Sequence, residues 1–535
     1  MELNIDQKES IKLILDFFKS SDKLFLLSGS AGTGKSTIIT YLLTNKHFND
    51  KKIALTATTN KAVSVLNKMV NCDLKNLTFL TIHRLLNFKR TIDESGNAIY
   101  FSNLENSNWE LTKNTKNIYY YDIIIIDEAS MINKQMLKNI LFVSNKIKGK
   151  IILVGDDYQL PPINEVKSEV FSINIRKSRL DIIMRNKSSI TGFANEIKKL
   201  IKNKNHKIKL KSFLNETFSA SKSYEKWRNQ YIVDYKAGNY PIMLAFTNNQ
   251  CRLNNLEIRK TLFNTKDNYV IGELIVFNNY YKYNEISYYT SQQDIIKDIS
   301  VKLVKINNID FNELLNLRNL KVEVGIQKSN TQINCPICYE DSIDFTVETK
   351  CHHYFCETCI NLWLKKNKEC PYCRMSLVNS TNDVLIKDDL ELTEKIKNLR
   401  NSTNDMTFKA YSIHLNEGYI MVIHEDDQKK YDKFVELIFQ SLTNIKNYIQ
   451  KNYLNNFSKI LLNRLWEFYY NNLYDKFANI SYGYCITTHK SQGSTFQNVY
   501  VDMKNIIDKN HDHNSKYKCL YTAVTRSANK LNIVI

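Results

Sequence analysis

The sequence predicts an α/β fold built on parallel sheets, and three observations lead to this class. A glycine-rich loop at residues 29–36 follows a short apolar run and precedes a segment of helical character. Two later apolar runs, at residues 123–126 and 151–154, each lead into acidic residues. Short apolar runs that alternate with helical segments are typical of buried parallel strands, so we expect these runs to lie in such a sheet.

The composition limits the class of protein. A chain of 535 residues has room for roughly three to four domains. With 43% hydrophobic and 24% charged residues, it matches a folded globular protein and not a disordered or fibrous one. Its apolar runs are far shorter than the ~18 residues that span a bilayer, and its first residues lack the apolar segment of a secretory signal. We therefore expect an intracellular protein without a membrane partner.

The net charge favours a polyanionic partner. The 74 Lys and Arg residues exceed the 55 Asp and Glu residues, which gives a formal net charge of +19. Such an excess strengthens binding to nucleic acid through the release of counterions. The alternative is a basic surface that serves only solubility.

The loop at residues 29–36 has the pattern of a phosphate-binding loop. It reads Gly-Ser-Ala-Gly-Thr-Gly-Lys-Ser and lies between a predicted strand and a predicted helix. In this pattern the backbone amides bind phosphate oxygens, Lys35 reaches the β and γ phosphates of ATP, and the Ser36 hydroxyl ligates Mg²⁺. The predicted nucleotide-binding residues of this segment are Gly29, Ala31, Gly32, Thr33, Gly34, Lys35, Ser36 and Thr37.

Two acidic residues, Asp127 and Glu128, follow the apolar run 123–126. The carboxyl ends of parallel strands open onto a ligand crevice, so both side chains are expected near the phosphate loop. There Asp127 would complete the Mg²⁺ shell and Glu128 would orient or deprotonate the attacking water. Acids after a strand often only cap a helix, but the nearby phosphate loop favours the catalytic interpretation.

Three segments together resemble a known family. Residues 29–36 (GSAGTGKS), 123–130 (IIIIDEAS) and 154–162 (VGDDYQLPP) resemble motifs I, II and III of superfamily 1 helicases of the RecD/Dda/Pif type. Further segments resemble the glutamine motif that reads adenine, motif Ia, the DNA-contact motif that follows it, motif V and motif VI; these are, in order, residues 3–7, 57–62, 81–83, 488–495 and 521–526.

The resemblance implies two RecA-like cores, with ATP in the cleft between them and single-stranded DNA across the top, and movement from 5′ to 3′. By resemblance Gln7 contacts the adenine and Gln159 senses the γ phosphate. Arg185 and Arg526 would act as arginine fingers from the second core, which can raise the hydrolysis rate by about 10³ to 10⁵. A surface salt bridge is the alternative role for each arginine.

The same resemblance assigns DNA contacts. The residues concerned are Thr59, Asn60, Thr81, His83, His489, Lys490, Ser491 and Gln492. Two positions depart from the family: Thr58 stands where motif Ia usually has proline, and Thr525 stands where motif VI usually has serine. Neither change removes a charge or a phosphate ligand, so we expect both to affect only the detailed contacts with DNA.

Three other segments have two interpretations each. Residues 88–92 and 98–101 are predicted as a hairpin where the family carries the pin that separates strands, although an ordinary surface hairpin fits too. The lysine-rich stretch 198–211 could follow DNA phosphates, but a solvated helix and loop is favoured. The aromatic group Trp466, Phe468, Tyr469 and Tyr470 could stack on bases, but core packing is favoured.

Seven of the eleven cysteines lie between residues 335 and 373, which in an intracellular chain predicts metal ligands and not disulfides. The spacing there is Cys-x2-Cys-x12-Cys-x-His-x2-Cys-x2-Cys-x10-Cys-x2-Cys. Eight ligands make two tetrahedral zinc sites. About forty residues cannot bury a sufficient core, so we expect zinc to hold this module together.

This module resembles a RING finger, and the resemblance implies cross-braced pairing of its ligands. One zinc would bind Cys335, Cys338, Cys356 and Cys359, and the other Cys351, His353, Cys370 and Cys373. An exchange of His353 for its neighbour His352 stays open. The positions that contact a ubiquitin-conjugating enzyme in RING fingers are here Ile337, Trp363, Pro371 and Arg374. A zinc-held docking module without ligase activity is the alternative.

The complete prediction is an α/β protein with two RecA-like P-loop cores and an SH3-like β insertion that carries the RING module. The first core covers residues 1–165, with the pin at about 87–105, and the second covers 166–265 and 431–535. The insertion covers 266–330 and 381–430, and the RING 331–380.

The predicted function is that of an ATP-dependent DNA helicase with a RING-type ubiquitin ligase module, using ATP, Mg²⁺ and two Zn²⁺. The expected partners are single-stranded DNA, duplex junctions and a ubiquitin-conjugating enzyme, and a monomer is expected. The alternative is a DNA translocase or remodeller whose RING only docks a protein. An Asn-, Lys- and Ile-rich composition suggests an AT-rich genome such as that of a large DNA virus, so the site of action is a nucleus or a viral replication site.

Overall fold

The computed structural model consists of two compact units. The first comprises Met1–Ser300, Tyr411–Val422 and Ala478–Ile535, and the second comprises Val301–Ala410 and Ile423–Phe477. The structure describes residues 3–45, 48, 50–70, 76–86, 89–92, 98–101, 118–162, 165–182, 184, 189–306, 318–319, 322–324, 326–329, 334–338, 346–349, 351–364, 367, 369–375, 377–380, 384–385, 389–403, 406–452 and 456–535.

The first sheet has six strands, all paired in parallel, in the order β3-β2-β6-β7-β1-β8. Their bounds are β1 Leu24–Gly29, β2 Ile53–Ala57, β3 Leu77–Thr81, β6 Ile123–Ile126, β7 Lys150–Gly155 and β8 Arg176–Leu180. Successive side chains alternate between the faces, since Phe25 and Leu27 belong to one buried cluster and Leu24 and Leu26 to the other. The three strands expected from the sequence lie side by side as β6, β7 and β1.

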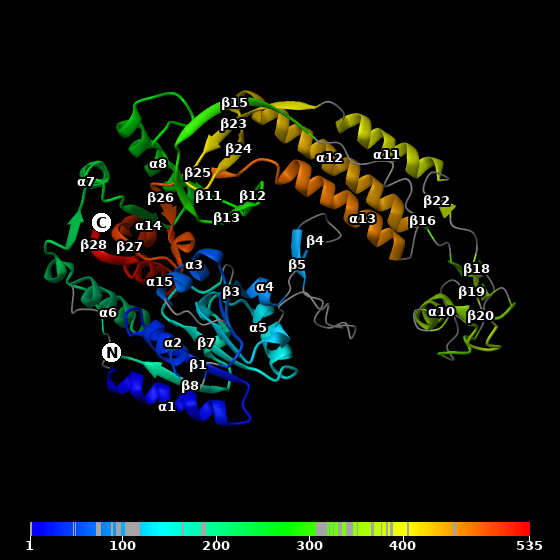
Figure 1. Ribbon diagram of the computed structural model, residues 1–535, viewed down its shortest axis with the longest axis horizontal. Helices are drawn as coiled ribbons and strands as arrows, with labels where there is room; N and C mark the ends of the chain where they lie inside the picture. Colours follow the sequence, from blue (N-terminus) through cyan, green and yellow to red (C-terminus); the bar gives the residue numbers. More distant parts are fainter. Residues whose placement is uncertain are drawn as a thin grey trace. The chain divides into compact units, whose positions relative to one another are not determined.

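Helices cover both faces of this sheet (Figure 1). They are α1 Ile5–Lys19, α2 Lys35–Leu43, α3 Asn60–Met69 and α5 Lys134–Ser144, with the short α4 Ile82–Leu85 after β3. Clusters on both sides bury almost every residue of the four inner strands, β2, β6, β7 and β1, so the carboxyl edge of the sheet holds the phosphate loop in place. Strand β8 lies in the span that the sequence assigned to the second core, yet it pairs with β1.

The second sheet has five parallel strands in the order β26-β10-β27-β28-β9. Their bounds are β9 Phe218–Ser221, β10 Ile242–Ala245, β26 Cys485–Thr487, β27 Phe496–Asp502 and β28 Ser527–Val534. The accompanying helices are α6 Ser189–Lys202, α7 Tyr224–Lys236, α8 Asn248–Phe263, α14 Met503–Lys509 and α15 His513–Val524. The α/β class with parallel sheets, predicted from the sequence, is therefore confirmed.

Antiparallel strands follow α8. Strands β11 Leu274–Phe277, β14 Gln293–Ile295 and β25 Ile480–Tyr482 form one sheet, and β12 Tyr281–Tyr283 and β13 Ile286–Tyr288 form a hairpin. Phe277 stacks on Tyr288 in their shared core, with ring centroids 4.7 Å apart. A further sheet has the order β15-β23-β24, with bounds β15 Asp298–Lys305, β23 Thr407–His414 and β24 Tyr419–Ile423. The SH3-like identity of this region stays a prediction.

The second unit is largely helical outside the cysteine-rich module. Its long helices are α11 Leu390–Thr403, α12 Glu425–Asn452 and α13 Asn456–Tyr469, followed by a π-helical turn, Tyr470–Tyr474. The sequence interpretation placed residues 381–430 in a β insertion, a span that holds both α11 and the strands β23 and β24, and 431–535 in the second core. These domain bounds stay a prediction. Trp466, Phe468, Tyr469 and Tyr470 are buried here, as the core-packing interpretation expects.

The described residues of the cysteine-rich module include few strands and helices. Strands β18 Ile326–Ser329, β19 Thr346–Thr349 and β20 Tyr354–Cys356 form a small sheet, and α10 Glu357–Leu364 follows it. Short pairs lie on either side in the chain, formed by β16 Arg318–Asn319 with β22 Val384–Leu385 and by β17 Val322–Val324 with β21 Val378–Ser380.

The predicted pin contains two paired strands. β4 Lys89–Ile92 and β5 Ala98–Phe101 are antiparallel. The predicted turn lies outside the described residues.

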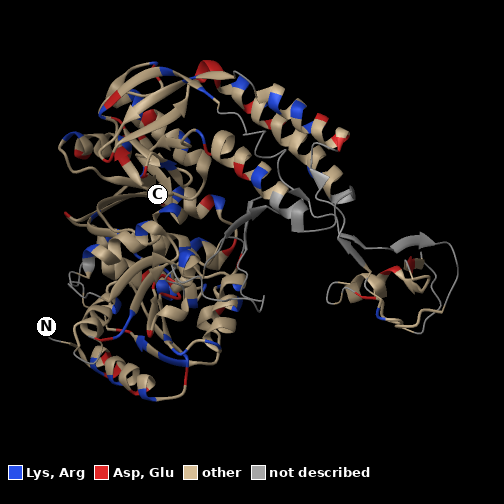
Figure 2. Ribbon diagram, turned by 45° about the vertical axis from the view of Figure 1, so that its right-hand side comes forward, with Lys and Arg blue, Asp and Glu red and all other residues tan. Residues whose placement is uncertain are grey.

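Two global predictions concern charge and membranes. Basic positions are spread over helices, strands and loops and lie among acidic ones (Figure 2). Within the part of the chain that the structure describes, no helix has the length and apolar character needed to cross a membrane.

Candidate nucleotide site and zinc-binding module

The phosphate loop leads from β1 into α2 through Gly34, whose backbone has a φ of 88°. A side chain there would be strained, and its Cβ would lie 2.2 Å from Nε2 of Gln7. The next residue, Lys35, donates from Nζ to the carbonyl oxygens of Gly29 at 2.7 Å and Ser30 at 3.1 Å. The loop thus folds around its own lysine, at the amino terminus of a helix where anions are favoured.

Gln7 reaches the phosphate loop from the start of α1. Asn4 and Gln7 form a capping box, in which each side chain accepts from the other's backbone N–H. This cap fixes the first turn of the helix, and Nε2 of the buried Gln7 donates to the carbonyl of Thr33 at 3.2 Å. The structure therefore brings Gln7 to the loop with which the sequence grouped it.

Asp127 lies at the carboxyl end of β6 in a buried position. Burial, and next the charge of Glu128, raise the pKa of Asp127 to about 7, against the opposing effects of the Glu128 backbone N–H and Lys35. Two adjacent carboxyls with one held against ionisation favour a divalent cation, and Mg²⁺ prefers such oxygen ligands. Asp127 therefore fits the Mg²⁺ of a nucleotide complex. Ser36, the other ligand predicted from the sequence, is half-buried in the first turn of α2.

The segment after β7 supplies a second buried carboxylate and a buried amide. The backbone N–H of Tyr158 donates to Oδ1 of Asp156 at 3.0 Å. Gln159 is 5% exposed, and its Oε1 has no hydrogen-bond partner among the described residues. An unpaired buried polar atom is costly, so a ligand that donates to it would be favoured.

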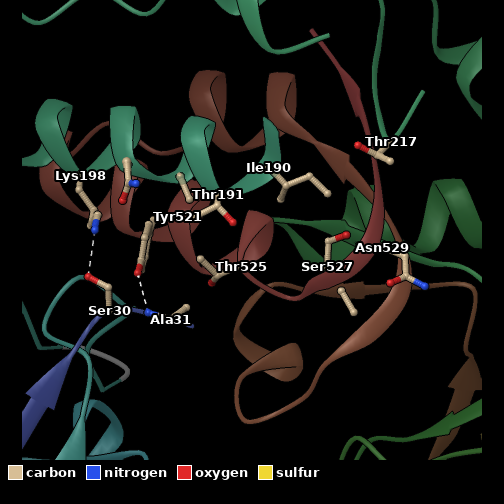
Figure 3. Close-up of a pocket in the computed structure, with 13 residues that line it drawn as sticks. Ser30, Ala31, Ile190, Thr191, Lys198, Thr217, Tyr521, Thr525, Ser527 and Asn529 are labelled. Carbon is tan, nitrogen blue, oxygen red and sulfur yellow. Dashed lines mark hydrogen bonds between the residues drawn. The ribbon is translucent and has the colours of Figure 1, made fainter. Parts of the chain in front are cut away.

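Two residues of the second core contact the phosphate loop (Figure 3). Oη of Tyr521, on α15, accepts from the backbone N–H of Ala31 at 3.1 Å and donates to Oδ2 of Asp156 at 2.9 Å. Nζ of Lys198, on α6, donates to Oγ of Ser30 at 3.0 Å. A cavity of about 400 Å³ is lined by Ser30, Ala31, Lys198 and Tyr521, among other residues.

The sequence assigned neither Tyr521 nor Lys198 to the nucleotide site. Lys198 fell in a lysine-rich stretch expected to be solvated or to follow DNA. Its helical spacing from Ile190 and Ala194, which also line the cavity, was a usable signal, because residues four apart share a face. Tyr521 begins the segment that resembles motif VI, but that resemblance did not indicate its contacts, since its partners lie more than 350 residues away.

The two predicted arginine fingers are placed differently. Arg526 is 5% exposed, and donates from Nε to the carbonyl of Thr522 and from Nη1 to that of Ser494, both at 3.1 Å. Its guanidinium thus binds main-chain oxygens of its own core. Arg185 lies outside the described residues. The preceding residue, Met184, donates its backbone N–H to the carbonyl of Gly32 at 2.9 Å, so Met184 lies at the phosphate loop.

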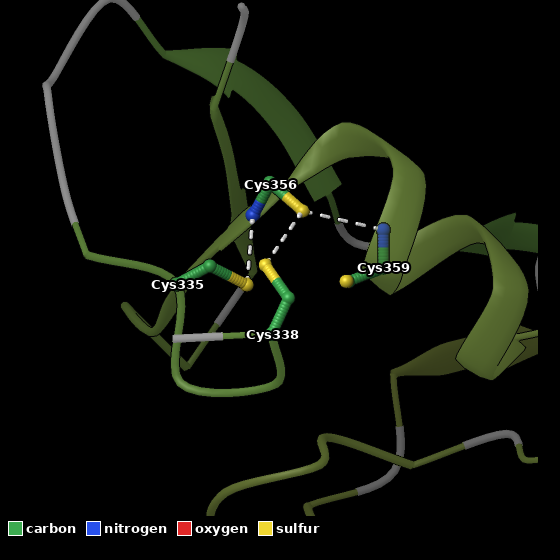
Figure 4. A group of neighbouring side chains, drawn as sticks. All are labelled: Cys335, Cys338, Cys356 and Cys359. Carbon is green, nitrogen blue, oxygen red and sulfur yellow. Dashed lines mark hydrogen bonds between the residues drawn. The ribbon is translucent and has the colours of Figure 1, made fainter. Parts of the chain in front are cut away.

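The cysteine-rich module contains two groups of four potential metal ligands. Cys335, Cys338, Cys356 and Cys359 form one group (Figure 4), and Cys351, His353, Cys370 and Cys373 form the other. Within each group all ligand atoms lie within 4.8 Å of one another. A tetrahedral Zn²⁺ with sulfur ligands at ~2.3 Å requires edges of about 3.8 Å, so the donor sets fit zinc.

The structure separates the two neighbouring histidines. Nδ1 of His353 lies 3.4 Å from the sulfur of Cys351 and 3.8 Å from that of Cys370. His352 is exposed with a φ of 58°, and its Nδ1 pairs with Glu348 at 2.7 Å. The ligand group therefore contains His353 and not His352.

Comparison with known protein families gives three matches along the chain. Residues 15–165 match the AAA domain family, residues 482–534 match the UvrD-like helicase C-terminal domain, and residues 333–374 match the Ring finger domain. The chain therefore contains an AAA domain, a helicase-type C-terminal domain similar to that of UvrD, and a RING finger domain.

Similar proteins include viral, bacterial and animal ones. The uncharacterized protein R530 of Acanthamoeba polyphaga mimivirus is 28% identical over 99% of both chains. The RecBCD enzyme subunit RecD of Buchnera aphidicola is 33% identical over 29% of this chain and 26% of its own. The E3 ubiquitin-protein ligase rnf8-A of Xenopus laevis is 33% identical over 13% of this chain and 14% of its own.

The helicase motifs expected to contact DNA divide into two groups. Thr59 and Thr81 use their hydroxyls to cap α3 and α4, while Ser491 is buried and Gln492 donates to the carbonyl of Leu160 at 3.0 Å. The other four are exposed, as Asn60 is, or half-buried, as His83, His489 and Lys490 are.

Two lysines of the helicase motifs, Lys61 in motif Ia and Lys490 in motif V, have pKa values that burial lowers. Burial lowers the pKa of Lys61 to about 8, and its Nζ donates to the carbonyl of Ser291 at 3.2 Å. Burial also lowers the pKa of Lys490, whose Nζ donates to Oδ1 of Asn278 at 2.8 Å. Lys490 and Asn278 line a cavity of about 680 Å³. Sequence reasoning missed Lys61, although it is adjacent to Asn60 in motif Ia.

The positions expected to contact a conjugating enzyme are accessible on the RING finger. Ile337, Trp363 and Pro371 are each partly exposed, and Arg374 is exposed. Nε1 of Trp363 donates to the carbonyl of Glu369 at 2.9 Å, which fixes the indole ring. Arg374 has a φ of 57° and donates its backbone N–H to Cys370 at 2.9 Å.

Proposed function

We propose that the protein is an ATP-driven DNA helicase that moves from 5′ to 3′ on single-stranded DNA. The observation that carries the proposal is the pair of hydrogen bonds from the second core to the phosphate loop, made by Tyr521 and Lys198. Phosphates bound at that loop would meet groups from both cores. Hydrolysis there would change the contacts between the cores, which is the requirement for a motor.

In the proposed mechanism the chain binds the phosphates through the loop amides and Lys35. Ser36 and Asp127 would hold Mg²⁺, which supplies positive charge to the phosphate oxygens. Glu128 would orient or deprotonate the attacking water, and Gln159 would contact the γ phosphate. Because Arg526 binds carbonyls of its own core, its proposed finger role requires these two bonds to break when nucleotide is bound.

The proposed DNA interface contains Asn60, His83, His489 and Lys490, with Thr59, Thr81, Ser491 and Gln492 supporting their helices and loops. The net charge of +19 supports this interface through counterion release. The alternative, a translocase that remodels complexes without opening duplexes, uses the same residues.

The motor is tested by ATP turnover with and without single-stranded DNA. We expect DNA to stimulate turnover in the wild type and Lys35→Ala to abolish it. A rate of ATP turnover that is the same with and without DNA, or the same in the wild type and Lys35→Ala, would reject the motor. Opening of substrates with 5′ overhangs in preference to 3′ overhangs tests the direction, and turnover without opening would favour the translocase.

For the RING finger we propose ubiquitin ligase activity. Ile337, Trp363 and Pro371 would contact a conjugating enzyme and Arg374 would hydrogen-bond that enzyme and ubiquitin, a positioning effect without a nucleophile of its own. The likeness to rnf8-A supports this proposal. The test is chain formation by wild type and Arg374→Ala with a panel of conjugating enzymes. Loss of chains in the variant is expected, and no chains from either protein would favour a docking role.

The proposed site of action is a nucleus or a viral replication site, and the proposed assembly is a monomer. The likeness to R530 over the whole length supports a viral setting. Light scattering of the purified 62.8 kDa chain tests the assembly, since a dimer would double the measured mass.

A further inference from the structure

We propose that Lys198 is a catalytic cation that the second core supplies to the terminal phosphate of ATP. This inference rests on the proposed function, because it assigns a new contact in the same nucleotide site. Its ligand is a nucleoside triphosphate, and its target is the phosphate that ADP lacks.

The position of Lys198 relative to the phosphate loop carries the proposal. Its Nζ lies 3.0 Å from Oγ of Ser30, while Nζ of Lys35 lies 3.1 Å from the carbonyl oxygen of the same residue. Two ammonium groups from different cores therefore meet at one loop residue. Lys35 is the lysine that phosphate loops place on the β and γ phosphates, so the second ammonium lies at the same end of the nucleotide.

The surroundings of Lys198 make an anionic ligand favourable. The lysine is partly buried, and burial lowers its pKa; next come the charges of Asp156, which raises the pKa, and Arg179, which lowers it. Asp181 and Lys202 have smaller opposing effects. Asp156 is itself engaged by the hydroxyl of Tyr521 and the backbone of Tyr158. A partly desolvated ammonium gains more from a phosphate oxygen than an exposed one would.

The helix that carries Lys198 belongs to the second core. Ile190, Phe193 and Ile197 of α6 are buried in the same cluster as Leu520 and Val524 of α15. Lys198 is therefore fixed to the second core by apolar packing, while the atom it contacts belongs to the first. A bond from this lysine to the γ phosphate would form when the cores close on ATP and be lost with phosphate release.

A purely structural role is the competing explanation. In that case Lys198 only ties α6 to Ser30, and its removal loosens the two cores whichever nucleotide is present. The two explanations differ in one measurable ratio. A γ-phosphate contact strengthens binding of a triphosphate and not of a diphosphate, whereas a structural tie affects both equally.

The experiment uses the full-length protein with Mg²⁺ and no DNA. Fluorescent ADP and a fluorescent non-hydrolysable ATP analogue are titrated into the wild type, Lys198→Ala and Lys198→Gln. We expect both variants to lose about tenfold or more in affinity for the triphosphate and less than twofold for ADP. Equal losses, or no loss, would overturn the proposal. With DNA added, kcat should fall by about 10²-fold, the low end for removal of one preorganised donor.

Two controls sharpen the result. Lys199→Ala removes the next lysine of α6, which is 61% exposed and pairs with Glu196 on the surface, so it should change neither affinity. Lys198→Arg keeps the charge and should recover most of the triphosphate preference. Because binding is measured without DNA, a protein that binds both nucleotides but shows no DNA-stimulated turnover would reject the motor and leave this proposal standing.

Discussion

The first sheet and the RING finger are stabilised in different ways. The sheet has two large apolar clusters, one on each face, to which every strand contributes. Among the described residues, the apolar cluster of the RING contains only Cys335, Val347, Phe355, Ile360, Cys370 and Leu377, and two of these are cysteines from the ligand groups. Apolar burial therefore stabilises the first sheet, whereas we expect the RING finger, with its small core, to depend on bound zinc.

Removal of zinc should have the largest effect, and this effect should be confined to the RING finger. A structural zinc contributes on the order of 10 kcal/mol of apparent folding free energy at neutral pH, so a zinc chelator should unfold the RING finger. Amide hydrogen exchange should rise across residues 334–375 and stay low in β1, β6 and β7. With Mg²⁺ kept in excess, DNA-stimulated ATP turnover should persist. Loss of protection in the first sheet as well would contradict the division.

The largest single-residue effect in the motor should come from a buried ion pair. Arg259 on α8 donates from Nε to Glu273 at 2.5 Å, and Glu273 is fully buried. Arg259→Met leaves that carboxylate without its partner, which should cost about 3–5 kcal/mol of unfolding free energy at pH 8. Arg259→Met combined with Glu273→Leu should regain most of the loss. Denaturant unfolding measures both, and a double variant no better than the single one would contradict this account.

The same pair gives a pH dependence. Burial raises the pKa of Glu273 to about 7, above its ordinary 4.5, and so outweighs the opposing effect of Arg259. Between these values the folded protein binds more protons than the unfolded one, so stability falls as pH rises through this window. Glu273→Gln should reduce that slope, and Arg259→Met should cost less at pH 5 than at pH 8. Melting temperatures across this range provide the measurement.

The sequence predicted those features of the motor that are contiguous in the chain. The phosphate loop, Asp127 and the strands around them could be recognised because a strand, a loop and a helix follow one another. The contacts of Tyr521, Lys198 and Lys61 could not be predicted, because their partners come from distant elements and only the folded cores bring them together. The helical spacing of Lys198 indicated only the face of the helix on which it lies. The assignment of residues 431–477 to the second core stays a prediction, because a helix pattern in the sequence does not specify the neighbour against which the helix packs.

Gly493 tests how closely two helicase motifs approach each other. This residue of motif V has a φ of 71°, and a Cβ on it would lie 2.9 Å from Cβ of Ala62 in motif Ia. Gly493→Ala should therefore cost about 1–3 kcal/mol through strain and crowding. The matched control is Gly272→Ala, where φ is 85° but nothing lies within 4 Å of the added atom. If both variants lost the same free energy of unfolding, crowding would contribute nothing and backbone strain would explain the whole effect.

Tyr521→Phe should have the smallest effect on stability and is the most informative about the motor. The change removes only the hydroxyl that joins Ala31 of the first core to Asp156. A hydrogen bond of this kind contributes about 1 kcal/mol, so the melting temperature should fall by only a few degrees. DNA-stimulated turnover should fall more than this loss of stability explains, because Asp156 loses a partner beside the phosphate loop. If turnover fell only as much as the loss of stability explains, the hydroxyl would serve only packing between the cores. Coupling between the two cores at the nucleotide site would then depend on Lys198.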